Sequence, residues 1–153
     1  MIFDVDGVLT DGTLWYGPRG EALKAFSAHD GHGIKLLAAG GVKVALLSGR
    51  RSKAVTFRAR ELGIREVHQG VDDKLRVFSK LLKKHRLAAD ATGFMGDELV
   101  DLPVLERCGF ACAPREAPEA VRSRVHYVAD APAGRGAVRE LCELVLRAQG
   151  GRA

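Results

Sequence analysis

The chain has 153 residues, of which 46% are hydrophobic and 28% are charged, and this size and balance predict one globular domain over residues 1–153. The net charge of +5 comes from basic residues scattered among acids, so we expect no nucleic-acid partner. The apolar runs fall short of the roughly 18 residues of a membrane-spanning helix, and early acids interrupt any secretory leader. We therefore expect no membrane association and a cytoplasmic location. The three cysteines lack metal-ligand spacing and are predicted to be buried thiols.

Short apolar runs alternate with longer stretches of helical period, a pattern typical of a parallel sheet covered by helices on both faces. The predicted strands are residues 1–3, 42–47, 92–95, 109–112 and 126–128. Three stretches carry apolar residues at helical spacing: Ile34, Leu37 and Ala38; Leu75, Phe78 and Leu82; and Val138, Leu141 and Val145. The predicted class is α/β.

Residues 13–26 break this rhythm and predict a β-hairpin around a Gly-Pro-Arg-Gly turn. Trp15 and Tyr16 lie on this segment, and a two-stranded hairpin with such side chains needs something to cover it. Two interpretations stay open from the pattern alone: a subunit interface, or a hairpin folded back on its own sheet.

Two acidic clusters follow predicted strands. Asp4 and Asp6 come directly after the first strand, and strand alternation turns both carboxylates to the same side. Asp97 follows strand 92–95, and Asp101 lies one helical turn further on. Because open α/β sheets bind ligands at the carboxyl ends of their strands, the clusters would gather the oxygen ligands that magnesium prefers. Taken singly, each is also explained as an acidic turn or a helix cap.

Two further segments suit phosphate. Ser48 and Gly49 end strand 42–47, and a hydroxyl and a glycine before a helix can form a phosphate cradle of backbone N–H groups. Lys74 begins a predicted helix and could neutralise phosphate charge. Alone, Ser48 could equally be a helix cap and Lys74 a solvated lysine.

The order of these motifs, Asp-x-Asp, then Ser, then Lys, then Gly-Asp-x-x-x-Asp, resembles the haloacid dehalogenase superfamily. Other stretches resemble its 3-deoxy-D-manno-octulosonate 8-phosphate phosphatase family: Asp11-Gly12, residues 20–26, Asp30-Gly31-His32-Gly33 and residues 134–138. The likeness covers almost the whole chain. It implies a Rossmann-like sheet with a small hairpin insertion and no cap domain.

The resemblance also implies the chemistry. Asp4 would be the nucleophile that becomes an aspartyl phosphate, and Asp6 the general acid and base. Asp4, the backbone carbonyl of Asp6, and Asp97 would hold Mg²⁺, while Asp101 would support the metal ligands or position Lys74. The reaction would release a free sugar acid for lipopolysaccharide assembly.

Phosphoryl oxygens would be bound by Ser48, Gly49 and Lys74. Arg50 and Arg58 are the candidates for the carboxylate of a sugar-acid phosphate substrate. Members of the cap-free type are homotetramers in which neighbouring chains help to close the active site, which suits the hairpin.

This interpretation has three alternatives. A nine-carbon sugar-acid 9-phosphate is handled by close relatives and stays open as the substrate. A non-catalytic tetramerisation domain would carry damaged motifs, whereas Asp4, Asp6, Ser48, Lys74 and Asp97 are all present. A response-regulator receiver has a different motif order and lacks a second carboxylate ready to hydrolyse the phosphoenzyme.

Overall fold

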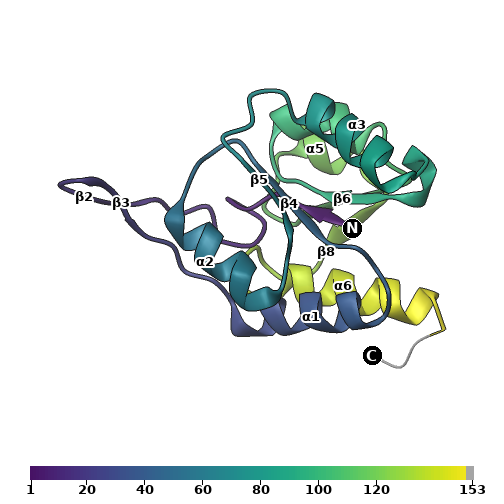
Figure 1. Cartoon of the computed structure of the whole chain (residues 1–153), viewed down its shortest axis with the longest axis horizontal. Coiled ribbons are helices and arrows are strands. Elements are labelled where there is room, and N and C mark those ends of the chain that lie inside the picture. Colours follow the sequence, from purple (N-terminus) through teal and green to yellow (C-terminus); the bar gives the residue numbers. More distant parts are fainter. Residues whose placement is uncertain (151–153) are drawn as a thin grey trace.

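The computed structural model describes residues 1–150 and has a six-stranded sheet at its centre (Figure 1). The strand order is β5-β4-β1-β6-β7-β8, and each neighbouring pair is parallel. The strands are β1 (Ile2–Phe3), β4 (Ala45–Ser48), β5 (Glu66–Gln69), β6 (Gly93–Met95), β7 (Phe110–Pro114) and β8 (Tyr127–Ala129). β1 lies between β4 and β6, so the segments after these three strands emerge side by side.

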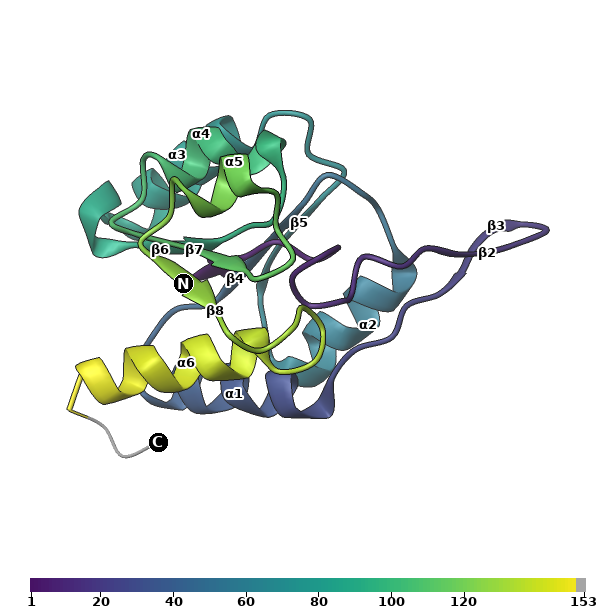
Figure 2. The same ribbon diagram turned by 180° about the vertical axis from the view of Figure 1, so that it is seen from behind.

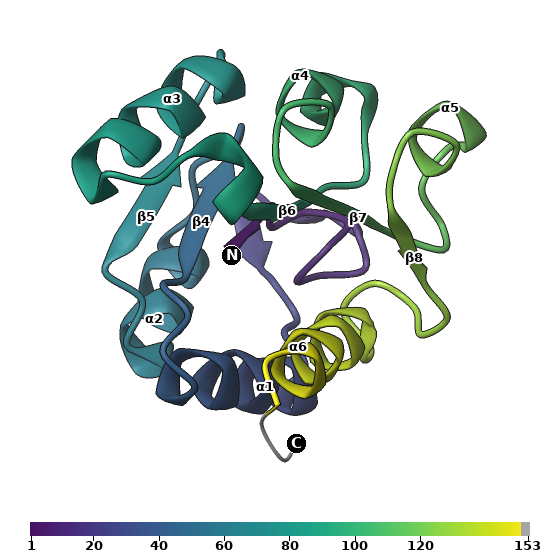
Figure 3. The same cartoon turned by 90° about the vertical axis from the view of Figure 1, so that its right-hand side faces the viewer.

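Helices cover both faces of the sheet (Figures 2 and 3). One layer contains α1 (Ala28–Ala39), α2 (Lys53–Leu62) and α6 (Ala137–Ala148), and the other contains α3 (Lys74–His85), α4 (Leu102–Leu105) and α5 (Glu119–Arg122). Two short 3₁₀ helices, η1 (Ala89–Ala91) and η2 (Leu99–Asp101), flank β6. Within residues 1–150, each helix is too short or too polar to cross a bilayer.

Two hydrophobic cores arise because successive strand residues point to opposite faces. Ile2 and Leu47 belong to the core under α3 and α4, whereas Phe3, Leu46 and Met95 belong to the core under α1 and α6. All three cysteines are free and buried, as predicted from their spacing.

The α/β prediction is confirmed, with corrections to its elements. The strand expected over residues 42–47 is β4 and begins three residues later. β5 was not predicted, and the helix expected directly after Gly49 is α2, which begins only at Lys53. β5 reads Glu-Val-His-Gln, which lacks the apolar run of a central parallel strand because it forms one edge of the sheet.

The predicted hairpin consists of β2 (Trp15–Gly17) and β3 (Gly20–Leu23), which form a separate two-stranded sheet. It projects from the body of the molecule (Figures 1 and 2). The exposed fractions are 53% for Trp15 and 63% for Tyr16. The hairpin is therefore not folded back on the main sheet.

Asp30 ties α1 to α6. Its carboxylate is 1% exposed and accepts hydrogen bonds from the backbone N–H groups of Gly136 (3.2 Å) and Arg139 (2.8 Å), in the first turn of α6. Burial raises the pKa of Asp30, although the two N–H donors oppose that shift. Asp30 thus serves α6 as a capping group supplied from a distant part of the chain.

Asp30→Ala should lower the free energy of unfolding by about 2 kcal/mol, because it leaves two N–H groups at the start of α6 without their acceptor. Chemical denaturation measures this change. Asp90→Ala, at an exposed position on η1, is the matched control and should have little effect. A loss no larger than that of the control would contradict the role of Asp30.

Candidate active site

Three carboxylates and one ammonium meet at the carboxyl ends of the central strands. Asp4 follows β1, Asp97 follows β6, Asp101 ends η2, and Lys74 begins α3. One oxygen from each acid lies within 4.8 Å of the others. The Lys74 Nζ is 3.0 Å from Asp4 Oδ2 and 2.6 Å from Asp101 Oδ1. Four residues from three separate segments of the sequence thus form one cluster.

The cluster carries more negative than positive charge, since one ammonium faces three carboxylates. Burial raises the pKa of Asp4 to about 6, although Lys74 opposes the shift. Burial, followed by repulsion from Asp4 and Asp101, raises the pKa of Asp97 to about 8. Burial acts to lower the pKa of Lys74, but the two neighbouring acids outweigh it and raise that pKa. A divalent cation would relieve the repulsion.

The acids also offer carboxylate oxygen atoms to such a cation. Asp97 Oδ1 is buried and accepts no hydrogen bond from residues 1–150. Gly7 lies against the same carboxylate: its φ is +81°, and a Cβ built on it would lie 2.0 Å from Asp97 Oδ2. The chain therefore keeps this space open with a glycine. Carboxylate oxygens are the ligands of hard divalent cations such as Mg²⁺, so the donor set fits.

Asp101 is fully buried and uses both of its oxygens within the protein. Oδ1 accepts from Lys74, and Oδ2 accepts from the backbone N–H groups of Asp97 (3.1 Å) and Glu98 (3.2 Å). Glu98 is the N-cap of η2 and forms a capping box with Asp101, and its side chain also accepts from Leu99 N–H at 2.7 Å. These bonds fix the loop that carries Asp97 and hold the Lys74 ammonium beside Asp4.

The cluster opens into a cavity of about 430 Å³, whose lining includes Asp6, Ser48, Gly49 and Arg50. Ser48 is 2% exposed, and its hydroxyl accepts from the backbone N–H of Arg50 at 3.2 Å. The sequence interpretation placed Ser48 and Gly49 directly before a helix. Instead α2 begins at Lys53 with Ser52 as its N-cap, so residues 50–52 separate the cradle from the helix.

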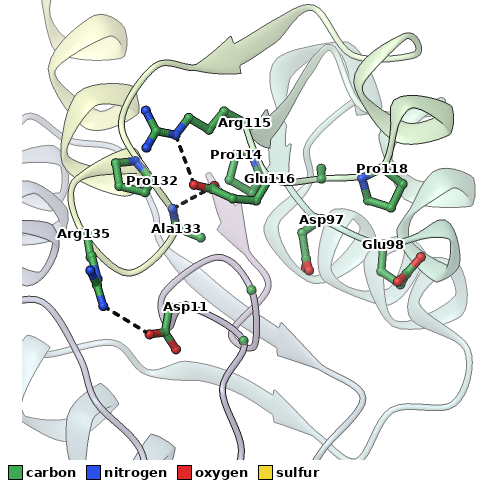
Figure 4. Close-up of a pocket in the computed structure, with 13 residues that line it drawn as sticks. Asp11, Asp97, Glu98, Pro114, Arg115, Glu116, Pro118, Pro132, Ala133 and Arg135 are labelled. Carbon is green, nitrogen blue, oxygen red and sulfur yellow. Dashed lines mark hydrogen bonds and ion pairs between the residues drawn. The ribbon is translucent and has the colours of Figure 1, made fainter.

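A second cavity of about 560 Å³ adjoins the first and shares Gly7, Gly12, Asp97 and Glu98 with it. Figure 4 shows two arginines on its wall. Arg115 follows β7 and pairs with Glu116 at 3.1 Å, and Arg135 pairs with Asp11 at 3.7 Å. Arg115 was not singled out from the sequence, where it is one arginine among many. Arg135 lies between two glycines in residues 134–138, one of the stretches that resemble the phosphatase family.

The structure does not bring Arg58 to this site. Arg58 lies on α2, where Nη2 donates to the Ser27 carbonyl (2.9 Å) and Nη1 donates to Glu61 (2.8 Å). It lines a separate hollow beside α1. Arg50, in contrast, lines the cavity of Asp4 and donates to the Tyr16 hydroxyl at 2.8 Å. Sequence spacing could not separate the two arginines, because both follow the same strand.

Comparisons with known proteins show which family the chain resembles. No protein-family model matches the chain. The 3-deoxy-D-manno-octulosonate 8-phosphate phosphatase of Escherichia coli K12 is 44% identical over 150 residues, which cover 98% of this chain and 80% of that protein.

Two solved structures are equally similar in fold. The cobalt-bound form of the corresponding Haemophilus influenzae phosphatase has a TM-score of 0.95 at 42% identity, covering 97% of this chain and 87% of that one. The Moraxella catarrhalis phosphatase, in complex with magnesium, phosphate and KDO, has a TM-score of 0.95 at 40% identity, covering 97% and 86%.

The parallel sheet and the acids at its central strand ends are those of a hydrolase of the haloacid dehalogenase superfamily. Within that superfamily, the 44% identity over 98% of the chain decides the family. The chain belongs to the 3-deoxy-D-manno-octulosonate 8-phosphate phosphatase family.

Gly7→Ala should abolish cation binding at the acid cluster, because the added Cβ displaces the Asp97 carboxylate. A saturating divalent cation stabilises the folded protein that binds it, by about 2.7 kcal/mol at 100 times its Kd. We expect added Mg²⁺ to raise the Tm of the wild-type protein and to leave that of Gly7→Ala unchanged.

Gly63→Ala is the matched control, because Gly63 has a similar φ of +74° and open space around its Cβ position. It should carry the same backbone strain but keep the Mg²⁺-dependent rise in Tm. An equal rise in both variants would contradict the arrangement of Gly7 and Asp97.

Proposed function

We propose that the protein is a magnesium-dependent phosphatase that hydrolyses 3-deoxy-D-manno-octulosonate 8-phosphate to the free sugar acid and inorganic phosphate. The observation that carries the proposal is the meeting of Asp4, Asp97, Asp101 and Lys74 beside a cavity that also contains Ser48. Family membership at 44% identity supports the substrate. The product would then enter lipopolysaccharide assembly.

Asp4, the backbone carbonyl of Asp6, and Asp97 would hold the Mg²⁺. The unpartnered, buried Asp97 oxygen and the net negative charge of the cluster support this assignment. When bound, the ion supplies charge neutralisation for the phosphoryl oxygens. Asp101 is fully engaged by Lys74 and by backbone N–H groups, which favours a role in fixing the other residues over direct contact with the metal.

Asp4 is suited to attack phosphorus. Its Oδ1 accepts the backbone N–H of Val5 at 2.7 Å and its Oδ2 faces Lys74, so the carboxylate is held in one orientation. In the first half-reaction an oxygen of Asp4 bonds to phosphorus as the bond to the sugar oxygen breaks, and Asp6 donates a proton to that oxygen. In the second, Asp6 takes a proton from water, whose oxygen attacks phosphorus and releases Asp4.

The phosphoryl group would be bound by Ser48, Gly49 and Lys74. The buried Ser48 hydroxyl, the backbone N–H groups around Gly49 and the Lys74 ammonium lie at the edge of one cavity. They supply hydrogen bonds and positive charge where the transferring group needs them.

The rest of the substrate would extend over the mouth of the cavity. Arg50 lines the cavity and stays our candidate for contact with the sugar acid. Because Arg58 lies outside it, any role of Arg58 at the substrate would be exerted on the site of a neighbouring subunit.

A panel of phosphorylated sugars, assayed with and without Mg²⁺, tests this function. We expect phosphate release from 3-deoxy-D-manno-octulosonate 8-phosphate with Mg²⁺ and loss of turnover when the ion is chelated. The kcat/KM for this substrate should exceed that for a nine-carbon sugar-acid 9-phosphate. A preference for the nine-carbon acid would reject our substrate while keeping the reaction class.

Asp4→Asn is the control for the chemistry within this panel. It removes the attacking oxygen with little change of shape and should lower kcat by at least about a thousandfold. The variant should keep the wild-type circular dichroism spectrum. Appreciable residual turnover would show that Asp4 is not the nucleophile.

We further propose a cytoplasmic homotetramer. The three unpaired, buried thiols suit a reducing compartment. The hairpin exposes Leu14, Trp15, Tyr16 and Leu23 together, which is apolar surface that a second subunit would cover. A non-catalytic assembly role is disfavoured, because the site that it would have lost is intact.

Trp15→Ala should therefore reduce the mass of the oligomer measured by solution scattering. Leu87→Ala is the control, since Leu87 is also exposed but lies outside the hairpin. We expect the Leu87→Ala oligomer to keep the wild-type mass. If Trp15→Ala kept it as well, the hairpin would not be the interface.

A further inference from the structure

Lys24 directly follows the hairpin strand β3, and its position is unusual for a lysine. Its side chain is only 1% exposed, and its Nζ donates a hydrogen bond to Asp6 Oδ1. Lysine normally keeps its ammonium in water, because removing the charge from solvent costs several kcal/mol unless a partner compensates. The ion pair with Asp6 therefore compensates for the burial of the Lys24 ammonium.

Lys24 is also the closest partner of Asp6. Among the described residues, it is the only side chain within hydrogen-bonding distance of the Asp6 carboxylate. Arg50 is further away, with its Nε 3.9 Å from Asp6 Oδ2. The Asp6 side chain remains 19% exposed and borders the cavity of Asp4. Without Lys24, the carboxylate would be free to rotate toward solvent.

A second acid, Glu21 on β3, also contacts Lys24. Glu21 Oε2 lies 3.2 Å from the Lys24 Nζ, and Glu21 Oε1 accepts a hydrogen bond from the Ser52 hydroxyl at the N-cap of α2. A chain of polar contacts thus runs from α2 through Glu21 and Lys24 to Asp6. The ammonium lies between two carboxylates, with a hydrogen bond to Asp6 and an ion pair with Glu21 at 3.2 Å.

We propose that Lys24 is a positioning residue that holds Asp6 in place for proton transfer. This inference rests on the proposed phosphatase function. The proton of Asp6 passes to the leaving sugar oxygen as the bond from that oxygen to phosphorus breaks and the bond from Asp4 to phosphorus forms. The Lys24 ammonium pairs with Asp6 and with Glu21. The hairpin is then part of the active site as well as a proposed interface.

The test uses two substrates with different needs for a proton. A sugar alkoxide is a poor leaving group and depends on the general acid, whereas p-nitrophenolate leaves without protonation. Single-turnover rate constants for release of the leaving group, the step that precedes hydrolysis of the aspartyl phosphate, are measured with Mg²⁺ and saturating enzyme. Under these conditions they do not depend on the fraction of folded protein. For Lys24→Met, we expect at least about a tenfold loss with 3-deoxy-D-manno-octulosonate 8-phosphate. The rate constant with p-nitrophenyl phosphate should stay within about twofold of wild type.

Lys80→Met, on the exposed side of α3, is the matched control and should behave as wild type with both substrates. Equal losses with both substrates, or no loss with either, would overturn the role of Lys24. These outcomes differ from failure of the proposed function, in which the wild-type protein itself would release no phosphate from the sugar-acid phosphate.

Discussion

The ion pairs of Lys74 determine how the site is built. Its ammonium lies 3.0 Å from Asp4 and 2.6 Å from Asp101, in a position that is 6% exposed. A buried ammonium without partners would be strongly destabilising, and a carboxylate left unpaired there would be equally costly. The three side chains are therefore stable only together. Because they come from the segment after β1, from η2 and from the start of α3, their pairing fixes three separate parts of the chain around one point.

The remaining parts of the site follow from this constraint. Asp101 also accepts hydrogen bonds from the backbone N–H groups of Asp97 and Glu98, which fix Asp97 relative to the ion pair. Gly7 leaves the space that the Asp97 carboxylate occupies. The negative charge that one lysine cannot balance is what makes the cluster suitable for a divalent cation. Stability and chemistry are thus coupled here: the repulsion among the acids is a cost in the free protein and a source of affinity for the ion.

The sequence predicted those features whose signal is local. Alternation and apolar runs located five of the six strands of the main sheet, and the motif order identified the acids, Ser48 and Lys74. β5 escaped because an edge strand needs little hydrophobicity. The separation of Arg50 from Arg58 could not be predicted, since it depends on where α2 begins. Nor could the contact between Lys24 and Asp6, because the path of a projecting hairpin relative to the sheet is set by long-range packing.

The tie between Asp30 and α6 has a consequence for how the chain acquires its structure. The two N–H groups that satisfy Asp30 are 106 and 109 residues further along the sequence. Likewise β1, the earliest strand, is the partner of both β4 and β6. A polypeptide emerging from the ribosome would hold β1 without β6, and Asp30 without the start of α6, until those later segments had been translated. Such non-local pairings slow folding and prolong the exposure of apolar segments to aggregation.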